Sequence, residues 1–314
     1  MPLFLTYSLL TIVPILVSVA FFTLMERKIL SYSQTRKGPN KVSLTGAPQP
    51  LADALKLFTK ELLKPSYSTG VLFLMAPTMG LALALIPWAL YLSPHSSLQM
   101  SRGILLFLCI SSLSVYVTLM AGWASNSKYA LLGAVRGIAQ TISYEVSMIL
   151  ILILPLILVQ SFNIQAYTGS QKLYWLVLIA APLALLWMTT SLAETNRAPF
   201  DFAEGESELV SGFNIEYGAA TFALLFMAEY ANILFLSFLT ATLFLGASTP
   251  ETPLTLGLPL WMKSAFIAFV FLWARATLPR LRYDLLMSMT WKSFLPVALT
   301  ILAPLIALTF TLSP

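Results

Sequence analysis

The stretch IAQTISYEVSMILILILPLILVQ (138–160) is almost entirely apolar and holds one charged residue, Glu145. An α-helix needs about 20 predominantly apolar residues to cross the hydrocarbon core of a bilayer, so this stretch predicts a membrane-spanning helix. Seven similar stretches predict an all-α integral membrane protein with about eight transmembrane helices in a single membrane domain (1–314). The expected spans lie near 3–25, 71–92, 103–121, 138–160, 173–192, 217–245, 259–275 and 294–312.

The composition of the whole chain is typical of a membrane protein. Hydrophobic residues make up 58% of the 314 residues and charged residues 10%, and the mean hydropathy is +0.82; soluble domains carry about 25% charged residues. One cysteine, Cys109, and one histidine, His95, cannot assemble a cluster of soft metal ligands. We therefore expect no metal and no cofactor bound by this chain.

The distribution of Lys and Arg predicts the topology. In chain order, the odd-numbered connections hold eight, two, one and four of these residues, so 15 of the 18 fall on one side. The positive-inside rule places these long polar loops on the inner side and both termini on the outer side. This bias explains the pI of about 9.3 without nucleic acid. No positive charge precedes the first apolar stretch, so we expect an anchor there and not a cleaved signal peptide.

The first inner loop (26–70) contains an amphipathic segment at 49–65. Its apolar and charged side chains recur at helical spacing on opposite faces, which predicts an interfacial helix lying in the plane of the membrane surface. The helix could pack on the membrane or on a partner, or it could form a lintel over a lipid-side entrance. Its apolar face holds Leu51, Leu55, Phe58 and Leu62, and its charged face holds Asp53, Lys56, Lys60 and Lys64.

The acidic loop (193–217) carries six carboxylates and one cation, Arg197. A solvated loop is one interpretation, but phenylalanines alternate with the acids and favour partial burial. Crowded, partly buried carboxyl groups cannot all ionise, because burial and like charge both raise their pKa values. The loop therefore predicts shared, transferable protons. The six acids are Glu194, Asp201, Glu204, Glu206, Glu208 and Glu216.

Glu145 and Glu229 fall within expected spans, where a charged side chain costs about 2.5 to 3.5 kcal/mol. Each is either a functional group facing a cavity or partner, or a neutral carboxyl in an interhelical hydrogen bond. In the basic loop (275–293), Arg282 is expected as a topological anchor. Arg275 is expected either as an anchor or as a partner of the acidic loop, because its planar guanidinium group can pair with carboxylates.

Four strings carry a family resemblance, and they match in order along the chain: ERKILSYSQTRKGPNKV (26–42), GWASNSKYALLGAVRGIAQTISYEVS (122–147), ETNRAPFDFAEGESELVSGFNIEYG (194–218) and RATLPRLRYDLLM (275–287). They resemble the subunit 1 family of NADH:ubiquinone oxidoreductase, respiratory complex I. The short termini and compact length resemble the mitochondrially encoded members. The resemblance implies a multi-pass protein of the mitochondrial inner membrane, with inner loops in the matrix and termini in the intermembrane space.

The resemblance also implies a function. The chain would be a core membrane subunit that forms the ubiquinone entrance and lower quinone chamber, within a proton-translocating enzyme that needs its other subunits for activity. Ubiquinone would be the substrate, and FMN and iron-sulfur clusters would belong to partner subunits. The partners implied are the peripheral-arm quinone-site subunits, adjacent antiporter-like membrane subunits and lipids. Positions matching the chamber are Glu26, Arg27, Arg36, Phe226, Tyr230, Arg275 and Arg280.

The same resemblance implies an acidic path from the chamber toward the pumping subunits. We expect the quinone tail to pass between the first and sixth spans, and charge changes at its headgroup to alter protonation along this path. A stand-alone proton or cation transporter that uses the same acids as ion sites is an alternative, and so is a structural anchor. The path residues are Glu145, Glu194, Asp201, Glu204, Glu206, Glu208, Glu216 and Glu229.

Overall fold

The structure is a computed structural model that describes residues 2–43, 45–90, 100–171, 175–246 and 260–312. Every regular element in these ranges is helical, so the all-α prediction is confirmed for the described part of the chain. The long helices are α1 (Pro2–Ser33), α3 (Gly70–Leu85), α4 (Gly103–Ala124), α5 (Lys128–Val159), α10 (Ala219–Phe244), α11 (Leu260–Thr277) and α13 (Leu295–Leu312). The shorter ones are α2 (Gln49–Thr59), α6 (Ile164–Ser170), α7 (Leu176–Ile179), α8 (Ala181–Glu194), α9 (Glu206–Leu209) and α12 (Tyr283–Met289).

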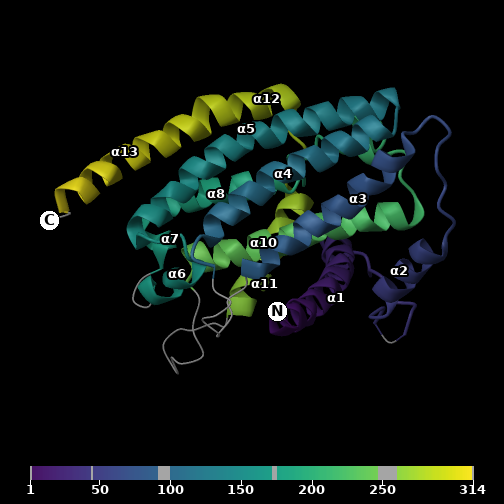
Figure 1. The fold of residues 1–314 in the computed structure, drawn as a ribbon, viewed down its shortest axis with the longest axis horizontal. Coiled ribbons are helices and arrows are strands. Elements are labelled where there is room, and N and C mark those ends of the chain that lie inside the picture. Colours follow the sequence, from purple (N-terminus) through teal and green to yellow (C-terminus); the bar gives the residue numbers. More distant parts are fainter. Residues whose placement is uncertain (1, 44, 91–99, 172–174, 247–259, 313–314) are drawn as a thin grey trace.

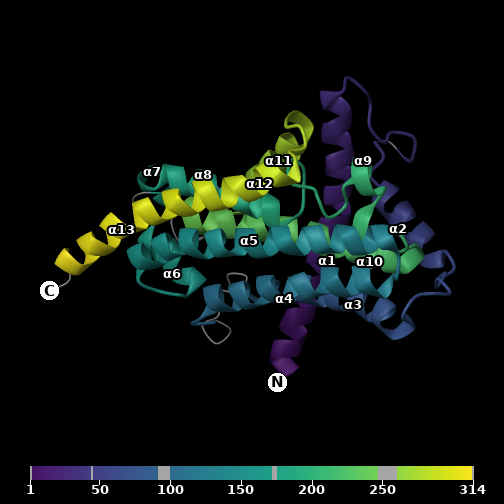
Figure 2. The same ribbon diagram turned by 90° about the horizontal axis from the view of Figure 1, so that it is seen from above.

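The long helices form an elongated bundle. Helices α3, α4, α5 and α10 run roughly along its longest axis, and α1 crosses them steeply (Figures 1 and 2). Helices α2 and α9 and the turn between α4 and α5 lie at one end, whereas α6 and α7 lie at the other (Figure 2). The first, third and fifth connections, which hold most of the Lys and Arg residues, therefore gather at one end of the bundle.

Within the described ranges, seven helical segments are long and apolar enough to cross a membrane. The eighth span expected, at 173–192, is divided into α7 and α8, which meet at Ala180. Pro182 in the first turn of α8 has no N–H to continue the preceding helix. Helix α8 has 14 residues, about 21 Å, which is short of a 30 Å hydrocarbon core. Eight separate spans are thus not confirmed.

Three expected boundaries also differ in the structure. The basic loop (275–293) is mostly helical: α11 continues to Thr277, and α12 joins α13 through a π-helical turn at Thr290–Phe294. Helix α1 continues to Ser33, so residues 26–33, which were expected to begin the first inner loop, form the last turns of this helix. The amphipathic helix α2 ends at Thr59, because Lys60 has extended backbone angles. Apolar periodicity did not reveal the ends of α1 and α11, because polar residues occupy their last turns. In α2 the periodic pattern continues past the residue where the backbone becomes extended.

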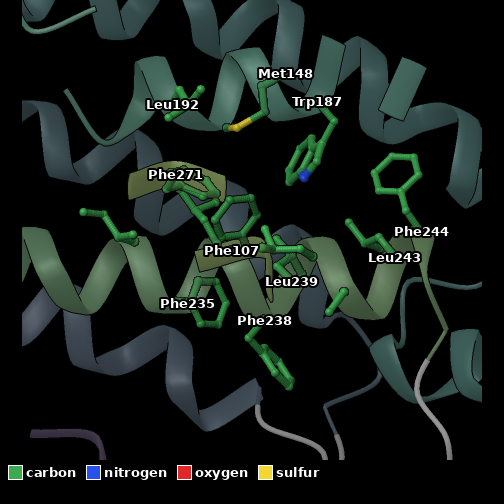
Figure 3. Close-up of a cluster of buried hydrophobic side chains, with 14 of the residues drawn as sticks. Phe107, Met148, Trp187, Leu192, Phe235, Phe238, Leu239, Leu243, Phe244 and Phe271 are labelled. Atoms are coloured by element: carbon green, nitrogen blue, oxygen red, sulfur yellow. The ribbon is translucent and has the colours of Figure 1, made fainter. Parts of the chain in front are cut away.

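Helix α10 forms the centre of the bundle. Its side chains are buried on most sides, against α3, α11 and α1, as expected for a helix that is hydrophobic all round. Figure 3 shows the aromatic part of this core, where Phe235 and Phe238 of α10 lie near Phe107 of α4. Trp187 of α8 also belongs to this aromatic core and lies next to Phe244. This packing fixes α10, which carries Glu229 and Tyr230, within the bundle.

The acidic loop packs directly on the backbone of α5. Gly212 has a φ of +61°, and a Cβ atom there would lie 1.8 Å from the carbonyl oxygen of Ala203, so only glycine fits. Gly133 of α5 faces the same place: its Cβ would lie 2.9 Å from Gly212 Cα and 3.0 Å from Ala203 O. The loop therefore approaches α5 more closely than any side chain would allow.

We expect Gly133→Ala to destabilise the protein by about 1 to 3 kcal/mol, the usual range for overpacking. The added methyl group must push the acidic loop off α5. The thermal stability of the purified assembly measures this effect. Gly169→Ala is the matched control, because a Cβ at Gly169 of α6 meets nothing within 4 Å. Equal stability of both variants would contradict the close approach.

Candidate functional site

Arg197 is a buried cation at the point where three parts of the chain meet. It lies in the acidic loop just after α8 and is 9% exposed. Its Nη1 is 3.5 Å from Glu26 Oε1 of α1, and its Nη2 is 3.8 Å from Glu229 Oε2 of α10. Its Cζ lies 4.5 Å from the ring centroid of Tyr230, which adds a cation–π contact. One guanidinium thus links α1, the acidic loop and α10.

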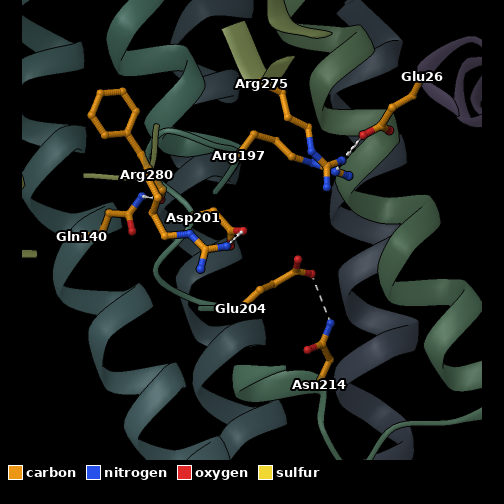
Figure 4. A network of polar contacts seen from close by, with 9 residues as sticks. Glu26, Gln140, Arg197, Asp201, Glu204, Asn214, Arg275 and Arg280 are labelled. Atoms are coloured by element: carbon orange, nitrogen blue, oxygen red, sulfur yellow. Dashed lines mark hydrogen bonds and ion pairs between the residues drawn. The ribbon is translucent and has the colours of Figure 1, made fainter. Parts of the chain in front are cut away.

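Two further arginines complete the network, which Figure 4 shows from close by. Glu26 is 3% exposed and forms an ion pair with Arg275 of α11 in addition to its contact with Arg197. Arg280 donates from Nη2 to Asp201 Oδ2 at 2.9 Å, which joins the connection after α11 to the acidic loop. Arg275 was expected either as a topological anchor or as a partner of the acidic loop, but it pairs with Glu26 on α1. Arg280 pairs with the acidic loop instead, through Asp201.

The network retains unused hydrogen-bonding capacity. Glu26 Oε2, Asp201 Oδ1 and Arg197 Nε are buried without a hydrogen-bond partner in the described ranges. Burial raises the pKa of Asp201, although the nearby Arg280 and Arg197 charges counteract part of this increase. Buried polar atoms in native proteins are normally paired, so a site with several unpaired atoms is suited to a further polar group.

A cavity of about 100 Å³ continues from this network into the bundle between α3, α4, α5, α8 and α10. Glu194 and Glu229 both line it, together with Asn196, Asn232 and Thr141. Its volume is large enough for several water molecules, although most of its lining residues are apolar. Both acids therefore face the same internal space.

Coulombic interactions extend this arrangement in both directions. Glu229 interacts with Glu204, Arg197 and Asp201 of the acidic loop, in decreasing order of strength. Glu194, the other acid that lines the cavity, interacts with Glu145 of α5. The acids thus form two electrostatically coupled sets, and one acid of each set lines the cavity.

The structure divides the predicted acids into two groups. Asp201 and Glu229 face the network, with Glu204, whose Oε1 accepts a hydrogen bond from Asn214 at 3.2 Å. Glu208 pairs with Arg136 and is exposed, and Glu216 is exposed at the loop end. The side chain of Glu206 and all of His95 lie outside the described residues.

The predicted chamber residues are also only partly brought together. Arg27 Nη1 lies 2.6 Å from Asp53 Oδ2 of α2, away from Arg197. Arg36 is exposed. Phe226 stacks near Phe222 on α10, with ring centroids 4.2 Å apart. Glu26, Tyr230, Arg275 and Arg280 belong to the network described above.

Sequence reasoning missed two residues of this site. Arg197 was noted only as the one cation among the six acids of its loop, and its central place in the network was not predicted. Gln140 of α5 is fully buried and donates to the backbone of the acidic loop. No sequence signal distinguishes this amide from any other polar residue in a membrane helix.

The comparisons with known proteins agree on one family. A family model described as NADH dehydrogenase matches residues 6–306. The chain is 53% identical over 301 residues to NADH-ubiquinone oxidoreductase chain 1 of Tetraodon nigroviridis, covering 96% of this chain and 93% of the relative. It is 54% identical to the same-named protein of Thymallus arcticus (96% and 94% covered) and 52% identical to that of Zaedyus pichiy (95% and 94%). The chain therefore belongs to the NADH dehydrogenase family.

Proposed function

We propose that this chain is a membrane subunit of a proton-translocating NADH:ubiquinone oxidoreductase in the mitochondrial inner membrane. In this proposal it forms the quinone entrance and couples quinone reduction to proton movement. The names of its relatives and its apolar helices support the assignment to the enzyme. One observation supports the coupling role above all: Arg197 contacts both Glu26 of α1 and Glu229 at the cavity wall.

The proposed entrance lies where α1, α2 and α10 meet. Phe22 of α1 packs edge-on against Tyr230 of α10, with ring centroids 5.9 Å apart. Beside them, α2 leaves Leu51, Leu55 and Phe58 at least half exposed. These apolar side chains offer a surface along which an isoprenoid tail can lie. Helix α2 is then the lintel of a lipid-side entrance, and the tail passes between α1 and α10.

The proposed coupling step is electrostatic. Quinone reduction requires two electrons and two protons, and the electrons come from the FMN and iron-sulfur clusters of partner subunits. This chain contributes binding, orientation and charge. A negative charge that develops at the quinone headgroup near Glu26 attracts the Arg197 guanidinium. As Arg197 moves away from Glu229, it stabilises the ionised carboxylate of Glu229 less than before. The proton affinity of Glu229 therefore rises, and Glu229 takes up a proton across the cavity from Glu194, which Glu145 in turn reprotonates. This relay requires that proton affinity differs between quinone states.

The proposal also assigns partners to surfaces. The peripheral-arm subunits cover the end of the bundle that carries α2, α9 and the connection after α11. Antiporter-like membrane subunits lie toward Glu145, which is half-buried between exposed apolar neighbours on α5. Lipids cover the remaining apolar surface.

We expect Glu229→Gln in the assembled enzyme to lower the rate of proton pumping by about 100-fold, the lower end of what a proton-transferring group contributes. Glutamine keeps the size of the side chain but cannot exchange a proton. Pumping in proteoliposomes is measured beside quinone reduction, and Glu145→Gln is tested in the same way. The exposed Glu61→Gln is the control. Wild-type turnover and pumping per electron in both variants would remove these acids from the path.

We expect Asp53→Asn to raise the KM for a long-tailed ubiquinone by up to about fivefold, since an exposed ion pair contributes roughly 0.2 to 1 kcal/mol. The change releases Arg27 and loosens α2 from α1. A short-tailed analogue should keep its KM, because its tail does not need the lintel. Asp284→Asn is the control, as its pair with Arg282 is far more exposed. A rise of the same size for both quinones would contradict a role of α2 in tail passage.

A further inference from the structure

Gln140 is a buried amide that binds backbone rather than another side chain. It lies on α5 and is 0% exposed. Its Nε2 donates to Phe200 O at 2.7 Å and to Ala193 O at 3.0 Å, and Figure 4 shows it facing the acidic loop. Burying an amide is costly unless it is hydrogen-bonded. Here both donor hydrogens of the amide are used on one loop.

The two carbonyl groups that Gln140 binds stand at the ends of residues 194–199, called here the Arg197 segment. Holding both ends on one nitrogen atom closes the segment into a short loop. Two backbone hydrogen bonds join Arg197 to residues on either side of the segment. The Arg197 N–H donates to Leu192 O at 3.4 Å, and Arg197 O accepts from the Phe200 N–H at 2.8 Å. The backbone of Arg197 is therefore fixed relative to α5, and its side chain extends between Glu26 and Glu229.

The same segment also holds the second arginine. The Leu281 N–H donates to Pro199 O at 3.1 Å, directly beside the carbonyl that Gln140 binds. Arg280, the neighbour of Leu281, pairs with Asp201, the neighbour of Phe200. The connection after α11 is thus bound to a backbone strip that Gln140 anchors to α5.

We propose that Gln140 is a positioning residue for the coupling step. Its amide sets the place of the Arg197 segment and, through it, the distances of Arg197 and Arg280 from their carboxylates. The hydrogen bonds that Gln140 donates go to backbone carbonyl groups and not to these charged side chains. This inference rests on the proposed function, because it assigns Gln140 to the same network.

The chain contains a structural twin of this clamp at the other end of the bundle. Gln171, which follows α6, is 5% exposed, and its Nε2 donates to Leu243 O at 2.8 Å and Thr242 O at 3.3 Å. The Oε1 atoms of Gln171 and Gln140 are both buried without a hydrogen-bond partner among the described residues. Gln171 binds the last turn of α10, far from the acidic loop, so it shares the bonding of Gln140 without its location.

The test compares Gln140→Met with Gln171→Met in the assembled enzyme. Each change removes two hydrogen bonds to buried carbonyls, so both should lower thermal stability and the amount assembled. We expect only Gln140→Met to lower the proton-pumping rate per assembled complex, by about 10- to 100-fold, the range that a displacement of about 1 Å causes. Protons pumped per electron should fall with it. Neither quantity depends on how much enzyme assembles.

A graded variant keeps the test decisive if Gln140→Met does not assemble. The neutral carboxyl of Gln140→Glu retains one donor, so its pumping rate should lie between those of the wild type and Gln140→Met; Gln171→Glu is its control. Wild-type pumping in the Gln140 variants, or an equal loss in the Gln171 variants, overturns the positioning role. If Glu229→Gln loses pumping while the Gln140 variants do not, this inference fails alone; if Glu229→Gln also pumps normally, the proposed function fails.

Discussion

The buried charge of Arg197 is the constraint on which the arrangement of the site depends. In lipid there is little hydrophobic force to bring helices together, so polar contacts decide much of their pairing. A buried cation needs opposite charge nearby, and removing one partner of a buried ion pair costs about 3 to 5 kcal/mol. Arg197 finds its partners on α1 and α10. These helices must therefore meet at the acidic loop.

Much of the fold could be predicted from the sequence because the bilayer imposes a simple rule on length and polarity. The run at 138–160 became part of α5, and seven helical segments in the described ranges are long and apolar enough to cross a membrane. The rule fails where polar residues continue a helix, as at the end of α1, and where a proline such as Pro182 interrupts one. Helix ends depend on local backbone chemistry that hydropathy does not report.

The site could be predicted only as a list of charged residues. Sequence indicated Glu229 as a costly charge within a span and Asp201 as one of six crowded acids, but Glu208 belongs to the same loop as Asp201 and pairs at the surface with Arg136. Which carboxylates turn inward depends on the close contact between Gly212 and α5, a tertiary feature. The role of Gln140 depends on two backbone carbonyls 53 and 60 residues away. Periodicity cannot reveal such contacts.

The lengths of the contacts explain why this network can respond to a neighbouring charge. Arg280 holds Asp201 in a hydrogen bond of 2.9 Å, which fixes the acidic loop. Arg197 instead lies 3.5 Å from Glu26 and 3.8 Å from Glu229, and both separations are longer than a normal hydrogen bond. Its contact with the ring of Tyr230 favours neither acid over the other. A guanidinium held mainly by electrostatic attraction can move toward either acid with little loss of bonding. A fixed backbone and a loosely bound side chain are together what a charge sensor needs.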